Sequence, residues 1–144
     1  MDKERKKVIY VEDEPDLIEL CRISFNFSGF ELEGVLNGEE AMAVVNKIKN
    51  KEIQAPDAFI LDILLPKISG IEVLKEIRKN KELDGVPIVV FTNYSNEEYK
   101  NETRKHKNTK YVLKTDIIPT QLADMIEKMI EKSKNIFRDA QSIT

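Results

Sequence analysis

The chain has 144 residues, which is enough for one domain with a sizeable core and too few for a second folded module beside it. Its 23 Lys and Arg residues against 26 Asp and Glu residues give a net charge of -3, which lacks the basic excess typical of nucleic-acid-binding proteins. No segment approaches the roughly 20 apolar residues of a membrane-spanning helix, so we expect a cytoplasmic protein with neither nucleic acid nor membrane among its partners.

Segments of two kinds alternate along the chain. Short runs of apolar and β-branched residues, several of them nearly continuous, predict strands of a buried parallel sheet. In chain order these runs are Val8–Val11, Phe30–Leu36, Ala58–Leu61, Val86–Phe91 and Tyr111–Leu113. Between and after them, apolar residues recur at the spacing of amphipathic helices. The helical positions are Leu17, Leu20, Cys21, Ser24 and Phe25, then Ala41, Val44, Val45 and Ile48, then Ile71, Leu74 and Ile77, and finally Leu122, Met125, Ile126, Met129 and Ile130.

Residues that favour helix N-termini mark where these helices begin. Pro15 suits a first turn, and three polar residues each stand three positions before a glutamate, as in a capping box. These pairs are Asn37 with Glu40, Ser69 with Glu72, and Ser95 with Glu98. The last pair opens the weakest helix, in SNEEYKNETRKHKN, where only Tyr99 and Thr103 are suited to face a core.

The single cysteine and the single histidine are not expected to take part in chemistry. Cys21 lies among apolar helical positions and is expected to be a small core residue; a single cysteine also excludes a disulfide within the chain. His106 has no other ligand at metal-binding spacing, so we expect it on the solvated surface.

The alternation of strands and helices predicts one α/β domain over residues 1–131. Its expected core is a doubly wound, five-stranded parallel sheet with helices on both faces, and such sheets bind ligands outside the carboxyl ends of their strands. Residues 132–144 are expected to form the end of the last helix and a C-terminal tail, with no effector domain.

Polar side chains stand at four of the predicted strand ends. The first strand is followed by Glu12, Asp13 and Glu14, the third by Asp62, the fourth by Thr92 and the fifth by Lys114. A lone carboxylate inside the apolar run FILDILLPKISG would cost several kcal/mol if it were buried without a partner, but at the tip of the strand it can form a site. There, Pro66 ends the strand pairing and Gly70 permits close approach of the next helix.

Each strand end also has an ordinary interpretation by itself. Residues 12–14 could be an acidic helix start, and Asp62 could be a helix cap. Together the strand ends indicate a phosphoryl site. Carboxylates that converge repel one another unless a cation intervenes, and Mg2+ prefers oxygen ligands. Zinc is not favoured, because ligating His and Cys residues are missing.

Four segments of the chain carry a family resemblance. VIYVEDEPDL, LDILLPKISGIEVL, PIVVFTN and YVLK resemble the receiver domain of two-component response regulators, over roughly residues 6–131. The resemblance implies a flavodoxin-like fold with strand order 2-1-3-4-5. The receiver that the chain resembles is of the single-domain, chemotaxis-regulator-like kind.

The resemblance also implies roles for single residues. Asp62 would be the phosphoacceptor, Thr92 and Lys114 would bind phosphoryl oxygens, and Thr92 with Tyr111 would form a switch. The implied Mg2+ ligands are Asp13 and Asp62 directly, Glu12 through a water molecule, and the backbone carbonyl of Leu64. Transfer to an aspartate gives an acyl phosphate, a known covalent intermediate, and depends mainly on positioning and charge neutralisation.

The implied function is that of a phosphoprotein in signal transduction. The phosphoryl group would come from a histidine kinase or a histidine phosphotransfer protein, and the domain would catalyse only its own phosphorylation and dephosphorylation, without acting as an enzyme on another substrate. The output would be an unidentified partner protein, a phosphorelay or self-association. For a homodimer, the face formed by the fourth helix, fifth strand and fifth helix is the expected surface.

The chain departs from the family pattern beside the site. Thr115 follows Lys114 where receivers commonly have proline, and Asn93 follows Thr92 where a small residue is usual. We expect Asn93 and Tyr94 to border the access route. Two alternatives remain: a pseudo-receiver that binds partners without phosphorylation, and a haloacid-dehalogenase-like phosphatase. The second would need an acid at position 64, which is leucine.

Overall fold

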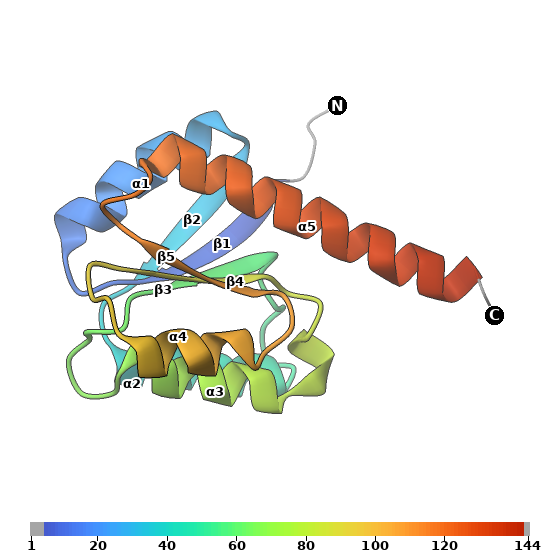
Figure 1. Ribbon diagram of the computed structural model, residues 1–144. Helices are drawn as coiled ribbons and strands as arrows, with labels where there is room; N and C mark the ends of the chain where they lie inside the picture. The colour runs from blue at the N-terminus through green and yellow to red at the C-terminus, as the bar shows by residue number, and fades with distance from the viewer. Residues whose placement is uncertain (1–4, 143–144) are drawn as a thin grey trace.

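The computed structural model describes residues 5–142 of the chain. Five parallel strands form one sheet (Figure 1). They are β1 (Lys6–Val11), β2 (Phe30–Val35), β3 (Ala58–Leu61), β4 (Ile88–Thr92) and β5 (Thr109–Leu113). The sheet order β2-β1-β3-β4-β5 confirms the predicted doubly wound α/β fold with strand order 2-1-3-4-5.

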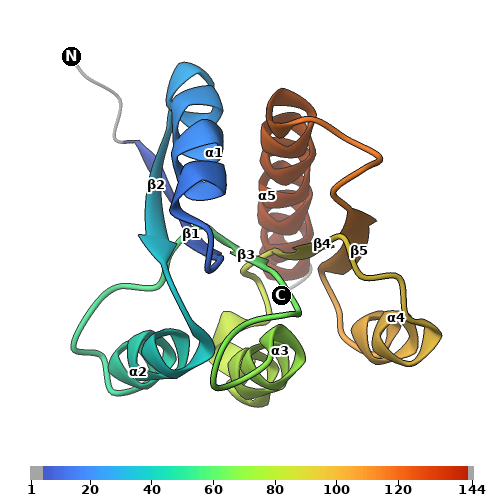
Figure 2. The same cartoon turned by 90° about the vertical axis from the view of Figure 1, so that its left-hand side faces the viewer.

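Helices cover both faces of this sheet. They are α1 (Pro15–Phe27), α2 (Gly38–Lys49), α3 (Gly70–Lys79), α4 (Glu97–Arg104) and α5 (Pro119–Ser142), with a short 3-10 helix, η1 (Lys81–Leu83), that the sequence did not predict. Figure 2 shows α1 and α5 on one face and α2, α3 and α4 on the other. Helix α5 continues through Ser142 and extends past the sheet in Figure 1. Across the described residues, no helix combines the length and apolar character that a bilayer span requires.

The continuous apolar runs arise because the strands are buried on both faces. Along β1, Tyr10 belongs to the core cluster under α1 and α5, while Ile9 belongs to the cluster under α2 and α3. Along β3, Ile60 and Phe59 divide in the same way. Cys21 is buried in the cluster under α1 and α5, which confirms the predicted core role.

Two of the predicted helix caps are present. The side chain of Asn37 accepts a hydrogen bond from the Glu40 amide at 2.8 Å, and the Ser69 hydroxyl accepts one from the Glu72 amide at 3.4 Å. Pro15 stands in the first turn of α1, as expected. These local signals therefore place the starts of α1, α2 and α3 correctly.

The predicted cap of α4 was wrong by one residue. Asn96, not Ser95, caps this helix, and its Oδ1 accepts a hydrogen bond from the Tyr99 amide at 3.0 Å. Both residue types are good caps, so the pattern could not choose between them. Thr103 is buried and Tyr99 packs half-buried against the core, which confirms the predicted inward face of α4.

His106 is less exposed than the sequence predicted. Its side chain is 23% exposed, and its Nε2 lies 3.9 Å from Oε1 of Glu102 on the preceding helix. In the turn that follows α4, the His106 amide donates to the Thr103 carbonyl oxygen at 3.2 Å. The ring nitrogen has one carboxylate beside it and no second ligating side chain among the described residues.

Arg78 at the end of α3 joins three segments of the chain. Its guanidinium donates to the carbonyl oxygens of Leu83 at 2.7 Å, Val86 at 2.8 Å and Asn108 at 3.0 Å, and to the Thr109 hydroxyl at 3.1 Å. Burial lowers the pKa of this guanidinium to about 10, so it remains charged at neutral pH. The contacts hold the loops before β4 and β5 against α3, which sets the positions of both strands.

Candidate functional site

The predicted strand-end residues lie at one edge of the sheet. Glu12 and Asp13 follow β1, Asp62 follows β3, Thr92 ends β4 and Lys114 follows β5. Strands β1, β3, β4 and β5 are neighbours in this order and run parallel, so their carboxyl ends meet.

Three of these residues form an acid cluster, which here means Glu12, Asp13 and Asp62. One carboxylate oxygen of each lies within 4.8 Å of those of the other two. Glu12 is 1% exposed and Asp62 is 7% exposed, while Asp13 faces solvent. The Lys114 ammonium lies 2.5 Å from Oε1 of Glu12 and 2.8 Å from Oδ2 of Asp62. Two of the three carboxylates are therefore paired with one ammonium group.

Burial and ion pairing have opposite effects on the pKa values of Glu12 and Lys114. Burial raises the pKa of Glu12, and the hydrogen bond and charge of Lys114 offset this only in part. Burial alone would lower the pKa of Lys114, but hydrogen bonds to Asp62 and Glu12 outweigh it and hold the pKa above the ordinary lysine value. Lys114 is therefore protonated at neutral pH and serves as a fixed positive charge.

The oxygen atoms of the cluster fit a hard divalent cation. Oδ1 of Asp62 is buried and has no hydrogen-bond partner in the described part of the chain. Leaving such an oxygen unsatisfied costs about 1–3 kcal/mol or more when it is charged. Leu64 lies two residues on, in the loop after β3, and its carbonyl accepts no backbone hydrogen bond from a described residue. An all-oxygen set of this kind suits Mg2+ rather than zinc.

Gly70 brings the start of α3 against the backbone of Asp62. Its amide donates to the carbonyl oxygen of Ile63 at 3.0 Å. A Cβ atom at position 70 would lie 1.8 Å from the carbonyl oxygen of Asp62, far inside contact distance. The predicted close approach is therefore confirmed, and it fixes the loop that carries the central aspartate.

On the other side of the site, Thr92 and Tyr111 connect to one loop. The Thr92 hydroxyl is buried and accepts a hydrogen bond from the Tyr94 amide at 3.1 Å. The Tyr111 hydroxyl donates to the carbonyl oxygen of Tyr94, and the Lys100 ammonium lies 5.9 Å from the centre of the Tyr111 ring. Asn93 and Tyr94 are exposed in this loop. Both members of the predicted switch thus contact the same residue, Tyr94.

The loop after β5 has ordinary backbone geometry where it leaves the strand. The peptide bond between Lys114 and Thr115 is trans. The Lys114 amide donates to the Thr92 carbonyl oxygen at 2.8 Å, and the Asp116 amide donates to the Leu113 carbonyl oxygen at 3.0 Å. The hydrogen bond to Thr92 of β4 fixes the backbone position from which the Lys114 side chain reaches the acid cluster.

Sequence reasoning missed one residue of the site. Tyr10 was part of a predicted strand, but its hydroxyl donates a hydrogen bond to Oε1 of Glu12 at 3.1 Å. Burial of the ring and repulsion from the Glu12 charge raise the pKa of this hydroxyl, so it stays protonated and acts as a donor. The only signal in the sequence was a phenol two residues before an acid in an otherwise apolar strand.

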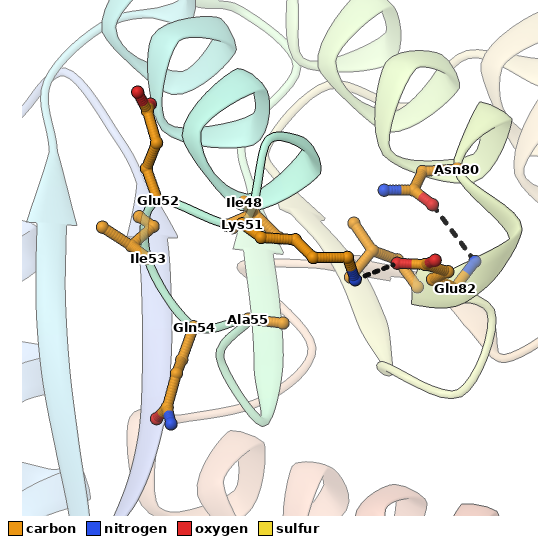
Figure 3. Close-up of a pocket in the computed structure, with 9 residues that line it drawn as sticks. Ile48, Lys51, Glu52, Ile53, Gln54, Ala55, Asn80 and Glu82 are labelled. Carbon is orange, nitrogen blue, oxygen red and sulfur yellow. Dashed lines mark hydrogen bonds and ion pairs between the residues drawn. The ribbon is translucent and has the colours of Figure 1, made fainter.

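A surface depression of about 370 Å3 lies away from the acid cluster. It lies between the segment that follows α2 and the end of α3, toward the amino ends of the strands (Figure 3). The Lys51 ammonium and the Glu82 carboxylate form an ion pair of 3.0 Å across it, and Asn80 accepts a hydrogen bond from the Glu82 amide at 3.1 Å. It shares no lining residue with the acid cluster.

Known proteins match this chain in both sequence and structure. Phosphate regulon transcriptional regulatory protein PhoB of Rhizobium meliloti (strain 1021) is 32% identical over 128 residues, which cover 89% of this chain and 53% of that protein. The phosphorylated cyanobacterial phytochrome response regulator RcpA has a TM-score of 0.71 at 30% identity, covering 89% of this chain and 93% of that one. The Mn2+-bound form of response regulator Rcp1 has a TM-score of 0.70 at 30% identity, covering 86% and 91%.

The chain matches only part of each of its longer curated relatives. The chain spans 33%, 53%, 26% and 36% of four curated relatives that it matches, which are named as transcriptional regulatory or DNA-binding response regulator proteins. Residues 8–131 match the sequence model of the response regulator receiver domain. The chain therefore belongs to the receiver domain family of two-component response regulators, a family of phosphoacceptor signalling domains.

Proposed function

We propose that this chain is a receiver that accepts a phosphoryl group on Asp62 in a Mg2+-dependent reaction. The donor is a histidine kinase or a histidine phosphotransfer protein, and the output is a change in protein–protein contacts. One observation carries the proposal: Oδ2 of Asp62 is bound by Lys114 at 2.8 Å, while the buried Oδ1 has no partner among the described residues and lies beside two further acids.

The residues of the site have different roles in phosphoryl transfer. Asp13 and Asp62 with the Leu64 carbonyl would hold Mg2+ directly, and Glu12 would hold it through a water molecule. When bound, the cation neutralises charge on the phosphoryl oxygens. A carboxylate oxygen of Asp62 attacks phosphorus, the bond from phosphorus to the donor's histidine nitrogen breaks, and that nitrogen keeps the electron pair.

Lys114 and Thr92 act on the same phosphoryl oxygens. The Lys114 ammonium is already held against Asp62 and Glu12, so little reorganisation is needed before it donates to the transferred group. The Thr92 hydroxyl accepts from the Tyr94 amide, and its own proton is available for a phosphoryl oxygen. Hydrolysis of the acyl phosphate returns the Asp62 carboxylate and releases inorganic phosphate, so the only reactions catalysed are those of the domain itself.

The output face is proposed to be α4, β5 and α5. The switch residues Thr92 and Tyr111 both contact Tyr94, so a movement of Thr92 toward a phosphoryl group would disturb the Tyr111 hydrogen bond. A hollow of about 530 Å3 lies on this face, between Lys100 and Arg104 of α4 and Met125 of α5. A partner protein or a second copy of the chain would bind there. Cytoplasmic location and the lack of nucleic-acid binding remain predictions.

Phosphoryl uptake by the wild-type chain tests the proposal. The protein is incubated with acetyl phosphate, with Mg2+ or with a chelator, and its intact mass is followed. We expect one added phosphoryl group per chain, only with Mg2+, and its removal by hydroxylamine, which cleaves acyl phosphates. If a folded protein gained no mass under either condition, a phosphorylation-independent interaction module would be favoured.

Asn93 is proposed to limit access to Asp62. Its exposed side chain follows Thr92, and in the proposed site it would border the line along which a donor or a water molecule approaches Asp62. We expect Asn93→Ala to speed both uptake from acetyl phosphate and autohydrolysis about tenfold, or about 1.4 kcal/mol in barrier. Mass-spectrometric time courses give both rates.

The matched control is Asn101→Ala, which truncates an exposed asparagine on α4. The alternative role for Asn93 is to cap the loop by a hydrogen bond to backbone near Ser95. Among the described residues, the Tyr94 and Tyr99 amides are bound by the side chains of Thr92 and Asn96. Unchanged or slower rates in Asn93→Ala would reject the access role.

A further inference from the structure

Tyr10 places a hydroxyl group at the boundary between the core and the acid cluster. The residue is 0% exposed and its ring packs in the core cluster with Phe25, Ile60 and Leu122. A phenol in such a position needs a hydrogen-bond partner, because an unsatisfied buried hydroxyl is unfavourable. Its hydrogen bond goes to Oε1 of Glu12, at 3.1 Å.

Three donors hold the Glu12 carboxylate in one orientation. Oε1 accepts from the Tyr10 hydroxyl and from the Lys114 ammonium, and Oε2 accepts from the Glu14 amide at 3.2 Å. A glutamate side chain has rotamer freedom that must be lost when it is ordered. Of the three donors, only Tyr10 belongs to the rigid, fully buried core of β1, while the other two lie in the segments that follow β1 and β5.

We propose that Tyr10 is a positioning residue for the cation site, acting through Glu12. This inference rests on the proposed Mg2+-dependent function. The phenol anchors Oε1 to the core, so the carboxylate stays turned toward Asp13 and Asp62 instead of sampling other rotamers. Partners behind a metal ligand orient it, and losing such a partner commonly weakens metal binding about 10–100-fold. Because Glu12 would hold the cation through a water molecule, the expected loss lies at the low end of that range.

Tyr10→Phe removes the hydroxyl and keeps the ring that fills the core. We expect the Kd for Mg2+ to rise about tenfold, measured by amide chemical-shift titration of the full chain with MgCl2. The matched control is Tyr99→Phe, which removes a hydroxyl from the half-buried tyrosine of α4 and should leave the Kd unchanged. Asp13→Ala, which removes a proposed direct ligand, should weaken Mg2+ binding more than Tyr10→Phe does.

A double variant separates positioning from a general effect on the fold. If Tyr10 acts through Glu12, then Tyr10→Phe should have no further effect on the Kd once Glu12→Ala has removed the carboxylate. An equal loss with and without Glu12 would overturn the proposal in favour of a structural role. In wild-type protein carrying 13C at the tyrosine Cζ, the Tyr10 signal should shift with the same midpoint as the amides, and an unmoved signal would also overturn it.

Failure of this inference can be told apart from failure of the proposed function. If wild type binds Mg2+, Asp13→Ala weakens it and Tyr10→Phe matches Tyr99→Phe, the positioning role is rejected and the cation site stands. If wild type shows no Mg2+-dependent shifts at all, the cation site and the positioning role are both rejected.

Discussion

Replacing Asp62 with asparagine is expected to lower phosphoryl uptake by at least about a thousandfold, to the background of the assay. The amide is nearly isosteric with the carboxylate but neutral, so it is a poor nucleophile. It also offers Lys114 a neutral acceptor in place of the charged Oδ2 now 2.8 Å away. The change keeps the volume of the buried side chain, so the fold should persist. Intact-mass time courses with acetyl phosphate and Mg2+ measure the loss.

Asp57→Asn is the matched control for that variant. Asp57 accepts a hydrogen bond from the Lys7 amide at 2.7 Å, near the start of β3 and thus at the edge of the sheet opposite the acid cluster. The side-chain carbonyl oxygen of the asparagine can still accept this hydrogen bond, so phosphoryl uptake should equal that of wild type. Undiminished uptake in Asp62→Asn would show that another acid is the phosphoacceptor and would contradict the proposed role of Asp62.

Gly70→Ala is expected to lower the free energy of unfolding by about 3 kcal/mol or more. The new Cβ would meet the backbone carbonyl oxygen of Asp62 at 1.8 Å. A backbone atom cannot rotate away as a side chain can, so α3 or the loop from Asp62 to Gly70 must move. Because domains of this size are stable by only about 5–15 kcal/mol, this is a large fraction of the total. Urea unfolding followed by circular dichroism measures it.

Gly85→Ala provides the comparison. A Cβ atom at Gly85 would meet no heavy atom within 4 Å, and this glycine does not have a positive φ. We therefore expect its unfolding free energy to stay within about 0.5 kcal/mol of wild type. Equal destabilisation by the two substitutions would mean that the close approach of α3 to Asp62 does not decide the stability of this loop.

Much of the fold was predictable because its signals are local. Near-continuous apolar runs predicted the parallel strands, and Asn37 and Ser69 predicted the starts of two helices. Boundaries were less certain where local signals compete. Strand β4 begins at Ile88 and not at Val86, because the Val86 amide donates to the Leu83 carbonyl oxygen in the preceding turn at 3.0 Å.

The strand-end argument also placed the acid cluster without a structure. Parallel strands end at one edge of the sheet, so Glu12, Asp13 and Asp62 had to approach one another once the strand order was known. Gly70 was predictable for a similar reason, because a glycine at the start of the next helix permits contact with the backbone before it. Residue type and chain order were sufficient for both.

The sequence by itself therefore determined the strands, most helix starts and which acids gather at the site. Only the tertiary structure decided which atoms pair. Lys114 reaches Glu12 across 102 residues of chain, Arg78 binds carbonyl groups in separate loops, and the Tyr10 hydroxyl turns toward Glu12. Such pairings depend on loop paths and side-chain rotamers in a packed interior. They are properties of the whole fold, since no local pattern of residues specifies the distance between two side chains that are remote in sequence.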